Sequence, residues 1–269
     1  MIGVAFVGLA AALAAGPTPA PRIASAWVDG TDLVLGLADG RRLTGAALVG
    51  AVLALRDEHG VRRTMKVEAV VQDPADPTGA VHLYRLTAPD AAGSWRPVCT
   101  PGPDGLQMAI PQPGPAGELA VWCTSGALGK CVRWGYHPWR RFAGGASLAP
   151  YHQACVHMAR ADYCGDGRPT TTEGRLIQMQ DAAGVRAWPD RARDFSFEAA
   201  WNEDGAVCVA RVRVPAKASL AGLERECPRL AGRVGAACTP ESSSRRTAFR
   251  QECSAGTCAG SRMAASSRR

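Results

Sequence analysis

The chain has 269 residues, of which 46% are hydrophobic, so it can bury one sizeable core or two small ones. More than half of its net charge of +7 comes from the last thirty residues, which hold six arginines and two glutamates. Because this excess lies at one end of a chain that is poor in aromatic residues, the composition argues against a nucleic-acid-binding protein.

Residues 1–26 are predicted to be a signal peptide. The apolar run over residues 1–15 is shorter than the roughly 20 residues that a membrane helix needs. Two small-x-small sites, Ala12-Leu13-Ala14 and Ala24-Ser25-Ala26, suit signal-peptidase cleavage. No basic residue precedes the run, and a buried strand or helix is the alternative. We therefore expect a secreted or periplasmic protein without a stable membrane span.

Residues 27–99 are predicted to form a β-rich N-terminal region, either a β-meander or a small barrel. Asp-Gly and His-Gly turns separate its short apolar runs, as in antiparallel strands. The runs cover residues 33–37, 49–55, 67–71 and 81–86. Proline and glycine dominate residues 100–117, which predicts a loop or link between subregions.

Residues 119–139 hold four aromatic residues and the pair Cys123 and Cys131, which brackets a Ser-Gly turn. This pattern predicts a disulfide-braced strand and turn whose aromatic side chains cover the core. An aromatic platform for a ligand is the alternative.

The segment LAPYHQACVHMARADYCGDGRPTTTE, residues 148–173, is the densest in chemically capable side chains. Its first half predicts an amphipathic helix with Ser147 as N-cap, Pro150 in the first turn, and Gly165 ending it in the left-handed conformation. The inward face holds Leu148, Tyr151, Cys155 and Met158. The outward face holds Gln153, His157 and Arg160, with His152 on the flank.

After this helix, strands are predicted over residues 176–179 and 185–188. Phe195, Phe197, Ala199 and Trp201 alternate in the first arm of a hairpin whose second arm covers residues 207–214. A short helix is expected at residues 220–224. Residues 239–269 are rich in serine and arginine and are predicted to form a disordered basic tail.

The chain has ten cysteines, an even number that predicts disulfides in an exported protein. They are Cys99, Cys123, Cys131, Cys155, Cys164, Cys208, Cys227, Cys238, Cys253 and Cys258. The sequence leaves their pairing open, although the short separation of Cys227 and Cys238 would allow one loop to be closed. Since no CxxC pair occurs, a structural zinc site is not expected.

Several spaced strings in residues 120–238 carry a resemblance to a known family. In chain order they are GKCVRWGYHPW, YHQAC, RADYCGDG, FEAAW, GAVCV, RVRV and CPRL. They resemble the ADYC domain family of bacterial, largely myxobacterial, exported proteins. The resemblance implies a cysteine-rich domain over residues 118–238 and an exported protein, and it implies no particular activity.

One hypothesis for the central segment is a thiol-dependent hydrolase or transferase. The nucleophile, the base and the group that orients the base would come from Cys155 or Cys164, His152 or His157, and Asp162 or Asp166. The alternative is that both cysteines are disulfide-bonded, because a nucleophile must be reduced and reachable whereas Cys155 faces inward.

A second hypothesis is a calcium-binding loop. Oxygen-bearing residues stand at positions one, five, nine and twelve of an EF-hand-like loop, namely Asp162, Asp166, Thr170 and Glu173. Gly167 occupies position six, as the motif requires. Cys164 replaces the expected acidic residue or asparagine at position three, and no convincing second helix follows. The alternative is a polar turn capped by its own side chains.

The interpretation that needs the fewest assumptions is an exported, disulfide-stabilised binding or structural module, whose partner the sequence does not identify. Calcium is the one cofactor that a motif suggests. The predicted fold class is α+β, mainly antiparallel β with one central helix, and stapled by disulfides.

Overall fold

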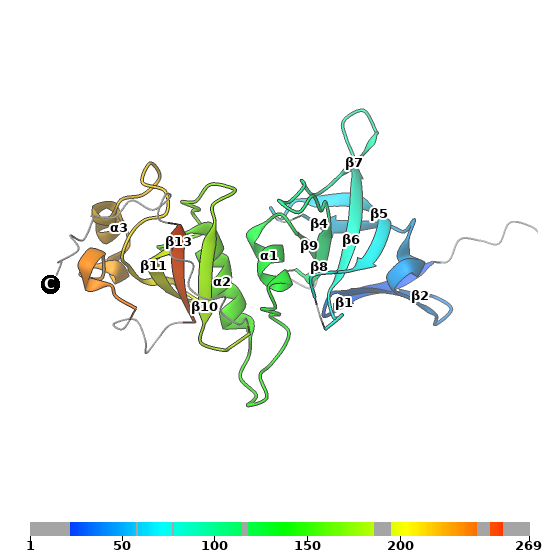
Figure 1. Cartoon of the computed structure of the whole chain (residues 1–269). Coiled ribbons are helices and arrows are strands. Elements are labelled where there is room, and N and C mark those ends of the chain that lie inside the picture. The colour runs from blue at the N-terminus through cyan, green and yellow to red at the C-terminus, as the bar shows by residue number, and fades with distance from the viewer. Residues whose placement is uncertain are drawn as a thin grey trace, which may run out of the picture.

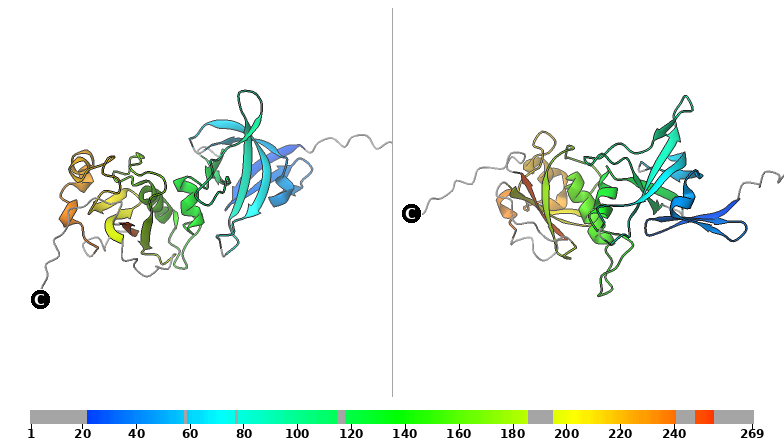
Figure 2. Two further views of the ribbon diagram at one scale, coloured as in Figure 1. Left: turned by 45° about the horizontal axis from the view of Figure 1, so that its top comes forward. Right: turned by 45° about the vertical axis from the view of Figure 1, so that its right-hand side comes forward.

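Two lobes follow one another along the chain in the computed structural model (Figure 1). The structure describes residues 22–57, 59–76, 78–114, 118–185, 195–240 and 248–254. The barrel lobe is formed by residues 23–123 and the motif lobe by residues 127–254. In two further views the segment that contains the helices α1 and α2 again lies between the barrel and the remaining strands (Figure 2). The contact between the lobes is therefore built on this helical segment.

Five strands of the barrel lobe close into a ring. In order around the ring they are β5 (Arg62–Gln72), β4 (Val52–Arg56), β9 (Leu119–Cys123), β8 (Ala109–Pro113) and β6 (His82–Pro89), which returns to β5. All neighbours are antiparallel except β4 and β9. The short strand β7 (Trp95–Pro97) pairs with β6 outside the ring. Met65 and Val67, two residues apart on β5, are both fully buried, as alternation in a strand requires.

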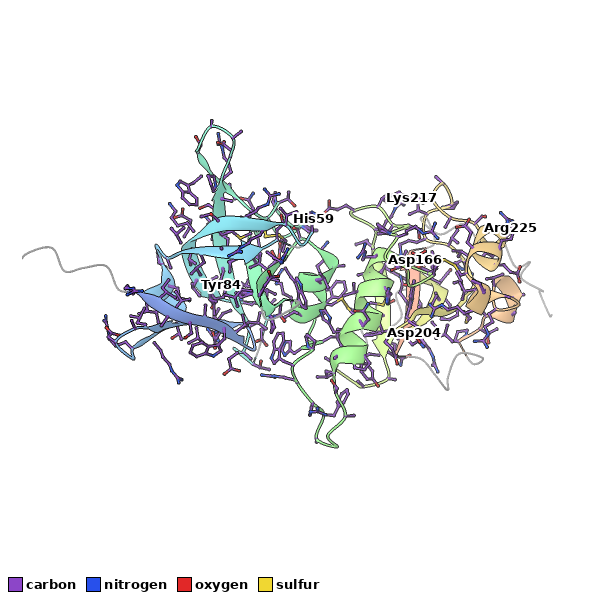
Figure 3. The ribbon with its side chains drawn as sticks, turned by 180° about the vertical axis from the view of Figure 1, so that it is seen from behind. His59, Tyr84, Asp166, Asp204, Lys217 and Arg225 are labelled. Atoms are coloured by element: carbon purple, nitrogen blue, oxygen red, sulfur yellow. A yellow bond between two sulfur atoms is a disulfide. The ribbon has the colours of Figure 1, made fainter. Side chains whose placement is uncertain are left out.

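A small antiparallel sheet packs against the barrel. It consists of β1 (Ile23–Asp29), β2 (Asp32–Leu37) and β3 (Arg42–Leu43), and the 3-10 helix η1 (Gly45–Leu48) follows it. Leu33 and Leu35 of β2 join the barrel core. The backbone N–H of Leu33 also donates to the hydroxyl of Tyr84, at 2.9 Å, inside the barrel (Figure 3).

The predicted strands of this lobe are confirmed at residues 33–37, 67–71 and 81–86, and the last residues of the predicted run 49–55 form β4. The predicted loop over residues 100–117 is wrong at Ala109–Pro113, which form strand β8. Its prolines hid the strand from the sequence. They are tolerated because β8 pairs with β6 only at Ala109, so Pro111 and Pro113 do not interrupt a continuous ladder on that side.

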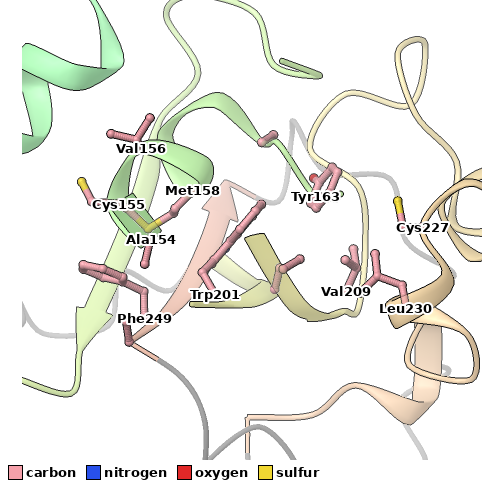
Figure 4. Packing of buried hydrophobic residues seen from close by; sticks show 14 of the residues in the cluster. Ala154, Cys155, Val156, Met158, Tyr163, Trp201, Val209, Cys227, Leu230 and Phe249 are labelled. Carbon is pink, nitrogen blue, oxygen red and sulfur yellow. The ribbon is translucent and has the colours of Figure 1, made fainter. Parts of the chain in front are cut away.

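The motif lobe contains a four-stranded antiparallel sheet covered by helix α2. The strand order is β10 (Ile177–Asp181), β13 (Phe249–Ser254), β11 (Phe195–Asn202) and β12 (Gly205–Val209). The helical elements are α1 (Ala127–Arg133), α2 (Ala149–Arg160), α3 (Leu220–Glu226), η3 (Pro228–Leu230) and η4 (Gly235–Ala237). Trp201 lies within the buried cluster between the sheet and α2 (Figure 4). The α+β class with mainly antiparallel strands is thus confirmed.

The predicted hairpin is confirmed, but its second arm ends at Val209 instead of Val214, and its first arm does not alternate strictly. A β-bulge in the pairing of β11 with β13 lies between Phe197 and Ala199. Glu198, at the bulge, and Ala199 and Trp201 after it are all fully buried, because the sheet is covered here on more than one side. The bulge is the reason why a charged residue, Glu198, comes to lie in the core.

The predicted disordered tail needs a correction. Phe249–Ser254 form β13, an inner strand of the sheet, whereas residues 241–247 and 255–269 lie outside the described residues. Phe249, Gln251 and Cys253 are all buried at alternate positions. The strand could not be predicted, because its buried positions include a glutamine and its neighbours are charged, so the sequence shows no alternation of apolar and polar residues. Of the predicted signal peptide over residues 1–26, residues 1–21 lie outside the described residues, and residues 23–26 belong to strand β1. Of the predicted strand over residues 185–188, residues 186–188 also lie outside them.

Helix α2 is confirmed with changes at both ends and on its surface. It begins at Ala149, so Leu148 rather than Ser147 is the N-cap, although the Ala149 N–H donates to the Ser147 hydroxyl at 3.1 Å. At its other end Ala161 rather than Gly165 takes the left-handed conformation (φ 50°). His152 and His157, predicted on the flank and the outward face, are both buried. The reason is that other segments cover α2 as well: Trp122 of the barrel covers His152, and the β11–β12 turn and Asp162 cover His157.

Four disulfides lie within the described residues. They join Cys99 to Cys123, Cys131 to Cys155, Cys164 to Cys227, and Cys208 to Cys238. The predicted disulfide stapling is confirmed. The suggested bracing by Cys123 and Cys131, and the suggested loop between Cys227 and Cys238, are wrong. The second bond ties α1 to α2, and the third ties the segment after α2 to the end of α3.

Among the described residues, no helix is both long and apolar enough to cross a membrane.

Candidate functional site

The residues with the most chemistry gather around the end of α2, where Ala161, Asp162, Tyr163 and Cys164 follow one another. Tyr163 is buried and stacks on Trp201 at a centroid distance of 5.2 Å. Its hydroxyl donates to Glu198 Oε1 at 2.9 Å and accepts the backbone N–H of Arg213 at 2.8 Å. Burial raises the pKa of Tyr163 well above its ordinary value, so the phenol keeps the proton that it donates.

Glu198 and Arg213 form an ion pair that is fully enclosed in the core. Arg213 Nε lies 3.1 Å from Glu198 Oε2, and Arg213 Nη2 lies 3.1 Å from Glu198 Oε1. Gln251 of β13 bridges the pair, accepting from Arg213 at 2.9 Å and donating to Glu198 at 2.9 Å. The same amide oxygen accepts from Trp201 Nε1 at 3.0 Å. Each partner is thus satisfied, which is the condition under which a buried charge pair is tolerated.

Arg213 also closes the C-terminus of α2. Its guanidinium donates to the carbonyl oxygens of Met158 and Ala159, at 2.7 and 3.1 Å. These carbonyls belong to the last turn, where few backbone donors remain and where the helix dipole favours a positive charge. The Met158 oxygen accepts one of them, the N–H of Ala161, at 3.1 Å. The side chain therefore joins the helix end to the sheet.

Asp162 organises the loop that follows. Its Oδ1 accepts the backbone N–H groups of Gly165 and Asp166, at 3.0 and 3.2 Å, and its Oδ2 accepts that of Gly167 at 2.9 Å. The Nδ1 atom of His157 lies 2.9 Å from the same Oδ2. Burial alone would raise the pKa of Asp162, but the hydrogen bonds from His157 and Gly167 outweigh it and hold the pKa below the ordinary value.

The ring of His157 is held at both nitrogens. Nδ1 faces the Asp162 carboxylate, and Nε2 lies 3.1 Å from the carbonyl oxygen of Glu203 in the β11–β12 turn. Gln153 Nε2 lies 3.0 Å from the same Nε2. Gly165 packs against this turn so closely that a Cβ would collide with the carbonyl oxygen of Asp204. His157 and Gly165 therefore fix the loop to the hairpin.

The four residues 161–164 thus share one kind of role. Ala161 turns the chain at the helix end, Asp162 caps the loop, Tyr163 enters the buried network, and Cys164 is bonded to Cys227. We refer to Ala161, Asp162, Tyr163 and Cys164 as the motif clasp. Sequence reasoning named Asp162 and Cys164 but missed Tyr163, Glu198, Arg213 and Gln251, because nothing in their spacing indicates that they meet.

The residues predicted for a thiol site are placed apart. Cys155 is bonded to Cys131 and Cys164 to Cys227, so neither sulfur is a thiolate in this state. Asp162 contacts His157, whereas His152 lies against the barrel. The structure therefore does not assemble His152 and Asp162 into one catalytic group, and the thiol site stays a prediction that a count of free thiols can test.

His152 instead belongs to the contact between the lobes. Its ring stacks on Trp122 of β9 at 5.1 Å, and Nε2 donates to the carbonyl oxygen of Leu128 at 3.1 Å. Burial lowers its pKa to about 4, so the ring is neutral at physiological pH.

The four predicted calcium ligands are engaged in other contacts or point to solvent. Asp162 accepts the bonds described above, Asp166 pairs with Arg168 at 2.7 Å, and the hydroxyl of Thr170 donates to the carbonyl oxygen of Ala161. Glu173 is exposed. A group of three or more metal-binding side chains is not found in the part of the chain that the structure describes. Calcium binding stays a prediction.

Two hollows lie beside these elements. One of about 500 Å³ is bounded by the loop after the motif clasp and by α3. The other, of about 860 Å³, lies between the lobes and is lined by Trp134 and Phe142 among others. Of the four aromatic residues in the predicted platform, Tyr136 is fully buried and Trp134 lines this second hollow. The predicted platform is therefore not one continuous surface.

Comparison with known proteins finds one relationship. The family model described as ADYC domain matches residues 45–215, which is more than half of the chain. The match begins in the barrel lobe and includes the motif clasp. No curated protein and no solved structure matches the chain significantly.

Proposed function

Because the chain belongs to the ADYC domain family, and because the four residues of the motif clasp are built into its core, we propose that it is an exported binding module. In this proposal the disulfides serve stability, and the function is carried by a surface outside the motif clasp. The motif clasp would then be a structural element that members of the family need in order to fold.

The observation that supports this proposal most strongly is the structural use of every residue in the motif clasp. A catalytic group needs an atom free to meet a substrate. The Tyr163 hydroxyl both donates and accepts a hydrogen bond, the Asp162 oxygens are occupied by three amides and one histidine, and the Cys164 sulfur is bonded to another sulfur. A binding or structural module does not need a free reactive atom in these four residues.

Export is supported by the disulfides, which persist in oxidising compartments and are rare in the cytosol. The structure also bears on where a signal peptide could be cut. Strand β1 starts at Ile23 and pairs with β2 through Ser25 and Ala26 among others. Cleavage after Ala26 would remove half of this strand, so we favour cleavage after Ala14.

We predict that peptide mapping of the protein recovered from the periplasm of a bacterial host, without reduction, gives a first residue between positions 15 and 22. Disulfide-linked peptides should join Cys131 to Cys155 and Cys164 to Cys227. A matched sample reduced before alkylation serves as control, because the linked peptides must disappear from it.

Two results would overturn the proposal. If Cys155 or Cys164 is free and alkylates fast at neutral pH, its thiolate is activated, and the thiol-dependent hydrolase or transferase becomes the better hypothesis. If the protein stays in the cytosol with its N-terminal segment intact, the exported module is excluded.

A further inference from the structure

The hollow of about 860 Å³ between the lobes, which we call the inter-lobe cleft, has the size of a site for a small organic ligand. Asp76 and Asp104 reach it from the barrel lobe, and Lys130, Arg133 and Arg140 reach it from α1 and the loop that follows. Whether the cleft attracts an anion or a cation depends on which of these charges already have partners.

The acidic residues of the inter-lobe cleft are satisfied within the protein. Asp76 Oδ1 accepts the N–H and the hydroxyl of Thr78, at 2.9 and 2.8 Å, and Oδ2 accepts the N–H groups of Ala80 and Val81, at 2.7 and 2.9 Å. Two carboxylate oxygens offer about four acceptor sites, so Asp76 has none left for a ligand.

Asp104 forms an ion pair with Arg133. The Arg133 guanidinium lies 2.6 Å from Asp104 and also holds the fully buried Asp73, at 2.7 and 3.1 Å. The positive charge of Arg133 is therefore already matched by two carboxylates. This cluster fixes α1 to the barrel and keeps a net charge of −1, because two carboxylates face one guanidinium, so Arg133 has no unpaired charge to offer a ligand.

Lys130 and Arg140 remain. Within the ranges that the structure describes, neither of them forms an ion pair or a side-chain hydrogen bond. Lys130 is half-buried on α1 and Arg140 is exposed. His137 also lines the cleft, but burial lowers its pKa, and its ring is stacked on Trp139 at 5.1 Å. Lys130 and Arg140 are thus the charged side chains of the cleft that have no partner among the described residues, so their N–H groups can donate to a ligand.

The same chain segment supplies an apolar wall beside these cations. Trp134, Phe142 and Leu148 all line the cleft. Phe142 is held edge-on against Tyr151 at 5.3 Å, and Trp134 is partly covered by the core of the motif lobe. Half-buried aromatic rings that are already fixed lose little entropy when a ligand covers them.

The hollow beside α3 lacks this combination. Its Arg168 pairs with Asp166 at 2.7 Å and lies 3.7 Å from Glu226, while Lys217 donates to the carbonyl oxygen of Thr171 at 2.6 Å. Arg225 lines this hollow as well and is exposed. The one aromatic ring in its lining is Tyr163, whose hydroxyl is already used in the core, so the hollow lacks the apolar wall of the inter-lobe cleft.

We propose that the inter-lobe cleft binds a small organic anion, in which a carboxylate or phosphate group on an aromatic or aliphatic body meets Lys130 and Arg140 while the body packs on Trp134. This inference rests on the proposed binding function and gives it a site and a ligand class. A bound ligand would contact both lobes, since the cleft is lined by residues of each.

The test uses three ligands of similar size: phenylacetate, phenyl phosphate and the uncharged phenylacetamide. Isothermal titration calorimetry should show binding of at least one anion, with the amide about tenfold weaker or more, because a hydrogen-bonded ion pair is lost. Whichever anion binds more tightly shows whether the site prefers a carboxylate or a phosphate.

Lys130→Gln and Arg140→Gln should each weaken binding of the preferred anion by about fivefold or more. Arg85→Gln is the matched control, since Arg85 is exposed on β6 and does not line the cleft. Its affinity should equal that of the unaltered protein. Thermal unfolding of all three variants confirms that they are folded.

The proposal is overturned if neither anion binds at millimolar concentration, if the amide binds as well as the anions, or if the Lys130 variant behaves like the Arg85 variant. The titrations use protein whose disulfides have been mapped as closed. If such protein does not bind the anions, only the proposed ligand site in the inter-lobe cleft is wrong. If Cys155 or Cys164 is free, the proposed function itself is wrong.

Discussion

Replacing Arg213 by methionine is expected to lower the free energy of unfolding by about 3–5 kcal/mol, the cost of removing one partner of a buried ion pair. The guanidinium is buried and bonded to Glu198, to Gln251 and to the last carbonyls of α2. Methionine fills much of the same volume, so the loss reports the uncompensated charge on Glu198 more than a cavity. Chemical denaturation followed by far-ultraviolet circular dichroism measures it.

Two comparisons make this result specific. Arg225→Met removes an exposed arginine from α3 (Figure 3) and should change stability by no more than about 0.5 kcal/mol. The double variant Arg213→Met with Glu198→Met should lose less than the sum of the two single losses, because no charge is left buried alone. Equal stability of the Arg213 and Arg225 variants would contradict the buried network.

Stability should also fall as the pH drops below 6.5, because the buried ring of His152 has a pKa of about 4. The unfolded chain takes up a proton near pH 6.5, whereas the folded protein does so only near pH 4. A group whose folded-state pKa is lowered contributes full stability above the unfolded value and loses it as the pH falls. For His152 the loss between pH 7 and pH 5 is about 2 kcal/mol.

The variant His152→Gln removes the titrating ring and should therefore show a smaller loss between pH 7 and pH 5. Arg85→Gln is the control, because Arg85 is exposed on β6 and its substitution leaves the His152 ring in place, so this variant should keep the full pH dependence. The free energies of unfolding of the unaltered protein and of both variants are measured at pH 7 and at pH 5. If the His152 variant loses as much as the unaltered protein, the ring does not carry the effect.

The parts of the fold that the sequence predicted are those with a simple hydrophobic period. Most strands of the barrel, the hairpin after residue 195 and the helix after Ser147 all follow such patterns. Strands β8 and β13 do not, because prolines interrupt the first and a glutamine faces the core in the second. A hydrophobic period in the sequence reveals only those strands that bury apolar side chains at regular positions. Strands β8 and β13 are instead held in place by backbone pairing with their neighbours.

The site was less predictable, because its contacts are long-range. Tyr163, Glu198 and Gln251 are widely separated along the chain, and only the β-bulge at Glu198 turns that carboxylate toward the others. The disulfide pairing could not be predicted from the sequence for the same reason. Cys123 and Cys131 are close in sequence, but the first faces the barrel core and the second faces α2, so each has another partner.

The variant Tyr163→Phe tests whether the motif clasp acts in folding. The substitution removes only the hydroxyl between Glu198 and Arg213 and keeps the ring on Trp201. We expect a loss of about 1–3 kcal/mol in the free energy of unfolding, because buried polar groups lose a partner, with the fold and the disulfides retained. If the variant is as stable as the unaltered protein, the motif clasp does not hold the fold together in this way.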